Sequence, residues 1–264
     1  MRKMLFVKLI AILLSANISN DDQSGFPPPE GNAVEAAHLL RSARSTSNSD
    51  ELRSIVEQAS NLLAPQSPGG EKLRQALSDR KDDQNLLQTA EEVLEMLSFE
   101  PLKEAELPDG FPTYTPAGSI ELKVYPKHRR AIANQFFTLF GHITSNQIAM
   151  TTPVRMEFEN NDGKLRQESM SFYYGKPTIG TVGTQGRVEV VEESSETVLS
   201  LGHQGTRTSE ITRDGERRLL SWLAANPKYE VAGKLIVMGY NSPMVPVDKQ
   251  FWEIQIPIKE KTEN

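Results

Sequence analysis

The side chains best suited to binding a metal ion are four histidines: His38, His128, His142 and His203. None of them stands in a His-Glu-x-x-His or comparable spacing, so the pattern assigns no metal site. We expect His38 to face solvent on a helix and His128 to lie in a basic turn. His142 falls near the end of an apolar helix, where the helix dipole favours a cation, and His203 falls at a strand end. We keep His142 and His203 as candidate metal ligands.

Residue patterns for covalent or phosphate chemistry are missing from the sequence. It contains no cysteine, which excludes thiolate nucleophiles, thiolate metal sites and disulfides. No serine stands in the Gly-x-Ser-x-Gly pattern of a nucleophile elbow. The glycine-rich string GTVGTQG at 180–186 lacks the Lys-Ser/Thr pair of a phosphate-binding loop, and it predicts a mobile loop. We therefore expect that the protein is not an enzyme.

Length and charge narrow the class of protein further. The chain has 264 residues, of which 38% are hydrophobic and 24% are charged, enough for one large domain or two small ones. Its formal charge is 29 − 35 = −6, and its densest basic cluster is the short string KHRR at 127–130. Nucleic acids require a concentrated basic surface. We therefore expect no nucleic-acid partner.

The first 32 residues predict targeting rather than folding. Residues 1–19 carry a basic pair, an apolar run from Met4 to Leu14 and then small residues, which is typical of a signal peptide. The run is shorter than the ~20 residues that span a bilayer. Residues 20–32 contain three consecutive prolines and predict a linker. We expect an exported protein, periplasmic or extracellular, with no membrane span in its mature form; it is cytoplasmic if residues 1–19 are not a signal.

A small helical region is predicted at residues 33–98. Apolar residues recur at helical spacing in 50–65 and in 83–99, with Asp50 as the N-cap of the first of these helices and Pro65 beyond its end. Two further helical patterns lie at 33–43 and 67–79. The apolar stripes must pack against each other or against the rest of the chain. The helices within 50–97 are also the candidate surface for a protein partner.

A junction at 99–118, which contains four prolines, separates this region from an α+β domain at 119–259. The pattern predicts a strand at 119–125, a helix at 131–144, strands at 148–158 and 168–175, and a second helix at 209–227 among further strands. Both halves follow the order strand–helix–strand–strand. The string MTTP at 150–153 predicts a bend at the start of a strand, because proline removes a donor from the ladder. We assign Met150 to packing and do not expect this stretch to hold a ligand.

Four strings in this domain carry a resemblance to a known family. IAMTTPV at 148–154 resembles the most characteristic motif of the SOUL haem-binding protein family. SIELKVY at 119–125, GYNSP at 239–243 and FWEIQIPI at 251–258 resemble three further segments of that family, in the expected order. The resemblance covers about residues 113–259. It implies a distorted antiparallel β-barrel with two helices, built from two βαββ halves, and it implies binding of haem or another tetrapyrrole.

By this resemblance, the ligand slot lies between the first helix and the loop after GYNSP. Its candidate wall residues, for which core packing is the alternative, are Phe137, Phe140, Met244 and Val245. The candidate cations for haem propionates are Arg129 and Arg130. Some family members carry a histidine late in the first strand as a proposed axial ligand, but Val124 occupies that position here. The resemblance therefore supplies no axial ligand, and His142 and His203 are the remaining histidine candidates.

Two hypotheses for the function follow. In the first, a SOUL-like domain binds haem or a related tetrapyrrole or hydrophobic small molecule without a covalent bond. In the second, the domain has lost its ligand and the chain is an interaction protein whose N-terminal helices recruit a partner.

Overall fold

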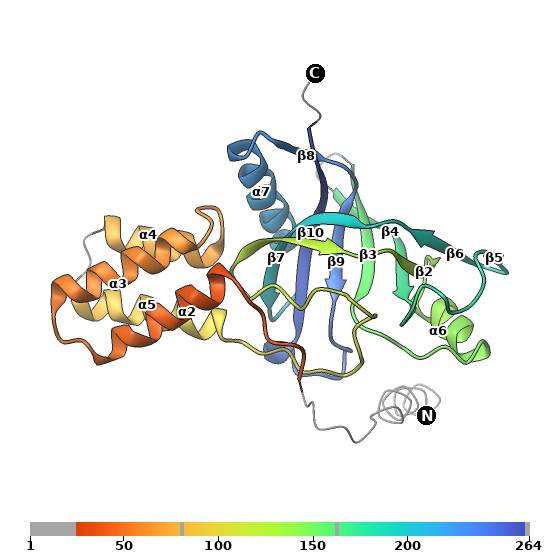
Figure 1. Ribbon diagram of the computed structural model, residues 1–264, viewed down its shortest axis with the longest axis horizontal. Coiled ribbons are helices and arrows are strands. Elements are labelled where there is room, and N and C mark those ends of the chain that lie inside the picture. The colour runs from red at the N-terminus through yellow and green to blue at the C-terminus, as the bar shows by residue number, and fades with distance from the viewer. Residues whose placement is uncertain (1–24, 80–81, 162–163, 262–264) are drawn as a thin grey trace.

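The structure of the protein is a computed structural model that describes residues 25–79, 82–161 and 164–261. The predicted signal peptide at 1–19 and the first part of the predicted linker lie outside the described residues. Within the described ranges, no helix is both long and apolar enough to cross a membrane. Four helices project from one end of a large, strongly curved sheet, and two more helices lie against that sheet (Figure 1).

The projecting helices are α2 (Asn32–Ser42), α3 (Ser49–Leu62), α4 (Pro68–Ser78) and α5 (Asp83–Leu97), with a short 3-10 turn η1 (Ala43–Ser45) after α2. Capping side chains fix where three of them begin. Asn48 accepts hydrogen bonds from the first turn of α3, whereas Asp50 lies inside that helix, so the predicted cap was misplaced by two residues. Ser67 caps α4 and Asp82 caps α5.

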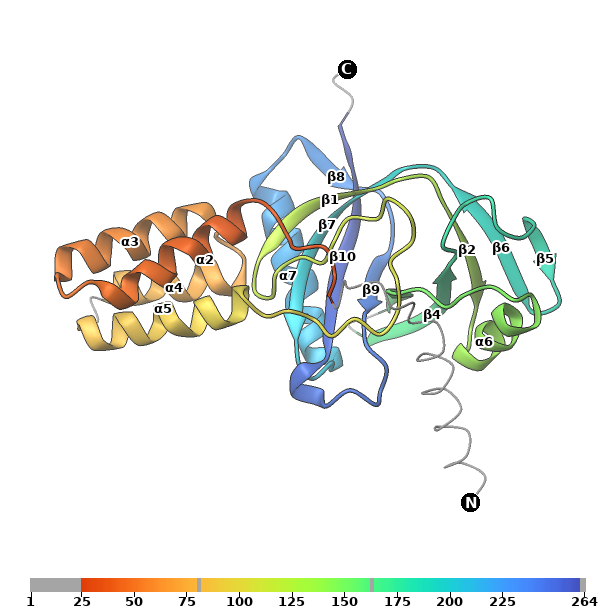
Figure 2. The same cartoon turned by 60° about the horizontal axis from the view of Figure 1, so that its bottom comes forward.

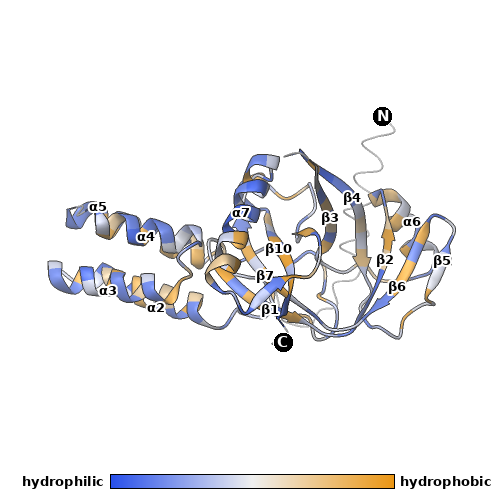
Figure 3. Cartoon of the chain, turned by 90° about the horizontal axis from the view of Figure 1, so that it is seen from above, coloured by the Kyte–Doolittle hydropathy of each residue, from blue (hydrophilic) through white to orange (hydrophobic). Residues whose placement is uncertain are grey.

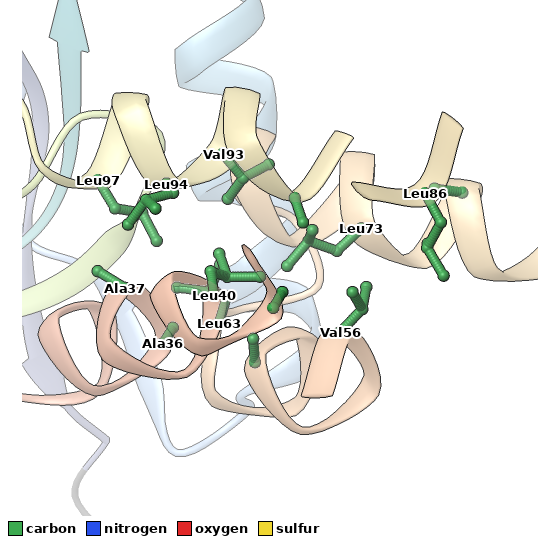
Figure 4. Close-up of a cluster of buried hydrophobic side chains, with 14 of the residues drawn as sticks. Ala36, Ala37, Leu40, Val56, Leu63, Leu73, Leu86, Val93, Leu94 and Leu97 are labelled. Carbon is green, nitrogen blue, oxygen red and sulfur yellow. The ribbon is translucent and has the colours of Figure 1, made fainter. Parts of the chain in front are cut away.

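The apolar stripes of these helices face one another (Figure 4). Leucines from all four helices share one buried cluster, including Leu40, Leu52, Leu73 and Leu86. On the outer surfaces of the four helices, the residues are mostly hydrophilic (Figure 3). The helices therefore bury a core of their own and do not depend on the sheet to cover their apolar faces.

All strand pairs of the sheet are antiparallel, in the order β1-β7-β10-β9-β3-β4-β2-β6-β5, with β8 added beside β10. The described strands are β1 (Ile120–Tyr125), β2 (His128–Ala133), β3 (Val154–Asn161), β4 (Lys164–Tyr173), β5 (Gly183–Gln185), β6 (Val188–Glu193), β7 (Glu196–Gln204), β8 (Tyr229–Val231), β9 (Leu235–Gly239) and β10 (Phe251–Glu260). The predicted α+β class is confirmed. Since β1 and β5 stand at opposite ends of this order, the sheet is open and does not close into the expected barrel.

The first half of the domain contains one strand more than the pattern predicted. Residues 131–133 were assigned to a helix, but they end strand β2, which pairs with β4 and β6. The helix that follows, α6 (Phe136–Ser145), begins only at Phe136. The alanines of β2 favour a helix locally, and the two neighbouring strands override that preference. His128 is consequently a buried strand residue and not part of a basic turn.

Helix α6 and the second sheet helix, α7 (Ser209–Ala225), pack on the same face of the sheet (Figure 2). Helix α6 packs on Phe172 of β4, and α7 packs on Leu201 and Ile254 of the central strands. Gly215 in the middle of α7 permits a close approach, because a Cβ there would overlap the Ile254 side chain. The two helices stand apart along the sheet, so the strands between them are left uncovered by either helix.

The segment 99–118 lies across the other face of the sheet. Phe111 and Tyr114 from this segment join a buried cluster with aromatic residues of the strands. Beneath it, the ammonium of Lys123 on β1 pairs with the carboxylate of Glu253 on β10 at 2.9 Å, and Thr115 N donates to the same carboxylate at 2.6 Å. This segment thus packs on the sheet through its buried residues and connects the helices to it.

Candidate ligand cavity

A cavity of about 670 Å³ lies between α6 and the N-terminal end of α7, over strands β3, β9 and β10. Its wall is mostly apolar and includes three aromatic residues of α6, three methionines and Trp252. The main lining residues are Phe136, Phe137, Phe140, Met150, Val154, Met156, Met170, Arg207, Pro243 and Trp252. We call this space the α6–α7 cavity. Its size and lining are those of a site for an apolar small molecule.

The Met-Thr-Thr-Pro string forms one wall of the cavity. The predicted bend is present: β3 begins at Val154, and the peptide bond between Thr152 and Pro153 is cis. Thr151 Oγ1 donates to Tyr173 O at 2.7 Å, and Thr152 Oγ1 donates to Tyr240 O at 3.0 Å, so both hydroxyls fix the bend to neighbouring strands. The bend turns the half-buried Met150 side chain towards the cavity. Met150 packs against the cluster beneath α6, as assigned, and it also lines the cavity.

The GYNSP turn forms a second wall and is held by Glu104 of the covering segment. The carboxylate of Glu104 accepts hydrogen bonds from Ser242 N at 2.6 Å and Ser242 Oγ at 2.8 Å. Asn241 Oδ1 accepts from Phe251 N at 2.9 Å, and Asn241 Nδ2 donates to Leu102 O at 2.7 Å. The polar residues of this motif thus shape the loop, and their side-chain groups are engaged by the protein itself.

Of the four predicted wall residues, two line the cavity. Phe137 is 61% exposed at its rim, and Phe140 is half-buried in its wall. The loop after the GYNSP turn does reach the cavity, but through Pro243 and Val247. Met244 is exposed and Val245 is buried, and neither lines it. Phe136, which sequence reasoning did not single out, stacks on Phe140 with ring centroids 6.0 Å apart.

The two arginines proposed for propionates lie on β2, away from the cavity. The Arg129 guanidinium donates to Ile179 O at 2.8 Å and pairs with Glu192 at 2.8 Å. Arg130 is buried and pairs with Glu193 at 2.7 Å. Although burial raises the pKa of the Glu193 carboxyl, hydrogen bonds from His128 and Arg130 hold it well below its ordinary value. Both arginines therefore join β2 to β6.

The two candidate histidines also lie outside the cavity. His142 Nε2 contacts the hydroxyl of Tyr174 at 2.7 Å. His203 lines a separate cavity of about 610 Å³ between α7 and the projecting helices. Burial lowers the pKa of both imidazoles, with Asp214 partly offsetting the shift at His203. Across the described ranges, no histidine lines the α6–α7 cavity, and no group of three His, Asp or Glu side chains could hold a metal ion.

Arg207 also lines the cavity, and sequence reasoning did not select it. It lies in the loop between β7 and α7, and its Nη1 contacts the sulfur of Met156 at 3.0 Å. Among the described residues, no aspartate or glutamate pairs with its guanidinium. Burial lowers its pKa, which marks a charge partly removed from water. Its position near β3 depends on the tertiary fold, so no local pattern marked it.

Known proteins resemble this domain in sequence and in structure. The model of a family described as SOUL heme-binding protein matches residues 96–257. No curated protein matches the chain in sequence. A crystal structure of the EcmrR C-terminal domain is 14% identical, covering 54% of this chain and 98% of its own, with a TM-score of 0.41. A crystal structure of a hydrolase from Listeria innocua is 10% identical to this chain. The match covers 55% of this chain and 94% of the hydrolase, with a TM-score of 0.41. A structure of EcmrR in a complex with DNA is 13% identical to this chain. The match covers 98% of this chain and 95% of EcmrR, with a TM-score of 0.44.

Proposed function

Because the chain belongs to the SOUL heme-binding protein family, we propose that the α6–α7 cavity binds haem or a related tetrapyrrole without a covalent bond. The observation that carries this proposal is an apolar cavity of about 670 Å³ with aromatic side chains along one side. Cavities that bury small ligands measure roughly 300–1,000 Å³ and are mostly apolar. A flat macrocycle is then covered by the phenylalanines of α6 on one side and by the strands on the other.

Haem also requires a donor for its iron and cations near its propionates. Met150, Met156 and Met170 line the cavity and offer thioethers, a type of donor that binds haem iron in other proteins. Arg207 offers a cation. The residues present therefore fit a tetrapyrrole held by apolar contacts, with a thioether and not an imidazole as the available donor. Haem, when bound, would supply redox-active iron, while this chain supplies enclosure and orientation.

We propose binding, and not catalysis, as the role of this cavity. The buried hydroxyls of Thr151 and Thr152 on its wall are committed to backbone carbonyl groups. Its carboxylate, on Glu104, is committed to the GYNSP turn. The serine hydroxyl that meets this carboxylate, on Ser242, donates to it at 2.8 Å as part of the same turn, so we assign the pair to holding the loop and not to acyl or phosphoryl transfer.

Titration of the purified protein with haemin tests the proposal. We expect a saturable shift of the Soret band at one equivalent, and we expect it to be lost in Met150→Trp, where the added ring fills the cavity. His142→Ala and His203→Ala are matched controls that should leave the shifted spectrum unchanged. A spectrum that never saturates, with haemin or with metal-free porphyrins, contradicts the proposal and favours the second hypothesis, in which α2–α5 recruit a protein partner. Unfolding midpoints check that each variant folds.

A further inference from the structure

Two charged residues on the wall of the α6–α7 cavity, Glu104 and Arg207, differ in the partners that the protein supplies for them. Glu104 accepts two hydrogen bonds from Ser242, so its carboxylate is stabilised by groups of the fold itself. Arg207 has no carboxylate partner among the described residues. A partly buried charge without a counter-ion is costly. The cavity therefore contains one cation that the protein leaves without an anion.

The contact that Arg207 does make is a weak one. Its Nη1 lies 3.0 Å from the sulfur of Met156, and a thioether is a poor hydrogen-bond acceptor. Met156 is buried, whereas Arg207 is exposed. A guanidinium has five N–H donors in a planar fork that matches a carboxylate. Most of these donors remain available to a ligand in the cavity.

The local backbone adds to the attraction for an anion. Arg207 directly precedes Thr208, whose side chain caps α7 by accepting from Ile211 N at 3.1 Å. The N-terminal end of a helix carries a partial positive charge. The loop that holds Arg207 is fixed on its other side, where Gly205 N donates to Gln250 O at 2.8 Å and Gly205 O accepts from Trp252 Nε1 at 3.0 Å. The cation is thus presented from a fixed loop.

The opposite end of the cavity is aromatic. Phe136, Phe137 and Phe140 of α6 line it, and no charged side chain of α6 does. A ligand that satisfies both ends has an apolar body at α6 and an acid group at the start of α7. Resting on the function proposed above, we infer that Arg207 binds one carboxylate of the tetrapyrrole and so makes the cavity select tetrapyrrole acids over their neutral esters.

The test compares protoporphyrin IX with its dimethyl ester, followed by quenching of tryptophan fluorescence, since Trp252 lines the cavity. Hydrogen bonds to a charged group contribute enough that the acid should bind the wild-type chain ~10-fold or more tightly than the ester. Arg207→Gln should bring the acid to the affinity of the ester and leave the ester unchanged. Arg207→Lys keeps the charge without the fork and should retain part of the preference.

Arg166→Gln is the matched control. Arg166 lies on β4, is 72% exposed in its side chain and does not line the cavity, so the preference for the acid should persist. Equal binding of acid and ester by the wild-type chain overturns the inference and leaves the proposed function standing. Failure of both ligands to bind overturns both. A preference that survives in Arg207→Gln, with an unchanged unfolding midpoint, also overturns the inference.

Discussion

The imidazole of His203 and the indole of Trp252 meet edge to face, with ring centroids 4.5 Å apart, on directly paired positions of β7 and β10. Trp252 lines the α6–α7 cavity, whereas His203 lines the cavity beside the projecting helices. The two rings therefore form the partition between these spaces. His203 therefore packs behind a wall residue of the ligand cavity and does not line that cavity itself.

The stability of the protein is expected to depend on pH through His203. Burial lowers the pKa of this imidazole more than Asp214 raises it, so the unfolded chain takes up the proton more readily. The favourable contribution of neutral His203 is then present above the ordinary histidine pKa of about 6.5 and is lost as the pH falls below it. Urea unfolding should show wild type losing stability relative to His203→Gln between about pH 7.5 and about pH 5. His38→Gln, at an exposed position on α2, is the control, and an equal relative change there would refute the burial argument.

Glu121 on β1 gives a dependence of the opposite sign. One of its carboxylate oxygens is buried without a hydrogen-bond partner, and burial raises its pKa to about 7, with Lys123 opposing the shift and Glu253 adding to it. Its contribution to stability is therefore full below about pH 4.5 and is lost as the pH rises through about 7. Relative to wild type, the free energy of unfolding of Glu121→Gln should rise by on the order of 1–3 kcal/mol between about pH 5 and about pH 8, as measured by denaturant unfolding. The exposed Glu95→Gln on α5 is the control, and an equal gain there would refute the burial argument.

Two helical glycines should respond to alanine in opposite directions. In α7, a Cβ at Gly215 overlaps Ile254, so Gly215→Ala should lower the free energy of unfolding by about 1–3 kcal/mol. In α6, a Cβ at Gly141 meets nothing within 4 Å, so Gly141→Ala should raise it by about 0.5–1 kcal/mol. Thermal unfolding of both variants measures the pair. A stabilised Gly215→Ala would mean that α7 does not pack as closely on β10 as described.

Phe137 should matter for the ligand more than for the fold. It lines the cavity yet is 61% exposed, so Phe137→Ala removes wall area while leaving little buried surface to lose. We expect porphyrin affinity to fall ~10-fold, because an aromatic contact and its burial contribute roughly 1–2 kcal/mol. The unfolding midpoint should stay near that of wild type. Leu220→Ala on α7, 44% exposed and outside the cavity, should leave both unchanged.

Local patterns in the sequence predicted the features that local chemistry determines. Proline in MTTP predicted the bend before β3, and apolar periodicity predicted α3, α5 and α7. The strand β2 escaped this reasoning because Ala131 and Ala133 become strand residues only when β4 and β6 flank them. Asn48 was missed as the cap of α3 because Asp50, two residues on, is an equally suitable residue type.

The candidate site was predictable only in part, for a physical reason. Phe137 and Phe140 lie on a helix face that the family resemblance associates with the ligand, and the structure brings that face to the cavity. The choice of arginines depended on partners distant in sequence. Glu192 and Glu193 of β6 engage Arg129 and Arg130, while Arg207 reaches Met156 only through the pairing of β7 with the central strands. The type of a single residue does not predict which distant residue it will pair with in the fold.

The segment 99–118 also bears on how the chain can be divided for experiments. Glu104 and Ala105 lie in the wall of the α6–α7 cavity, and Glu104 fastens the GYNSP turn opposite. A fragment that starts at the first strand would keep every strand and lose that wall, with Ser242 left without its acceptor. The shortest fragment expected to bind ligand therefore starts before residue 99 and includes the whole segment that precedes the sheet. To remove the helices and keep this segment, the chain must be cut at the end of α5.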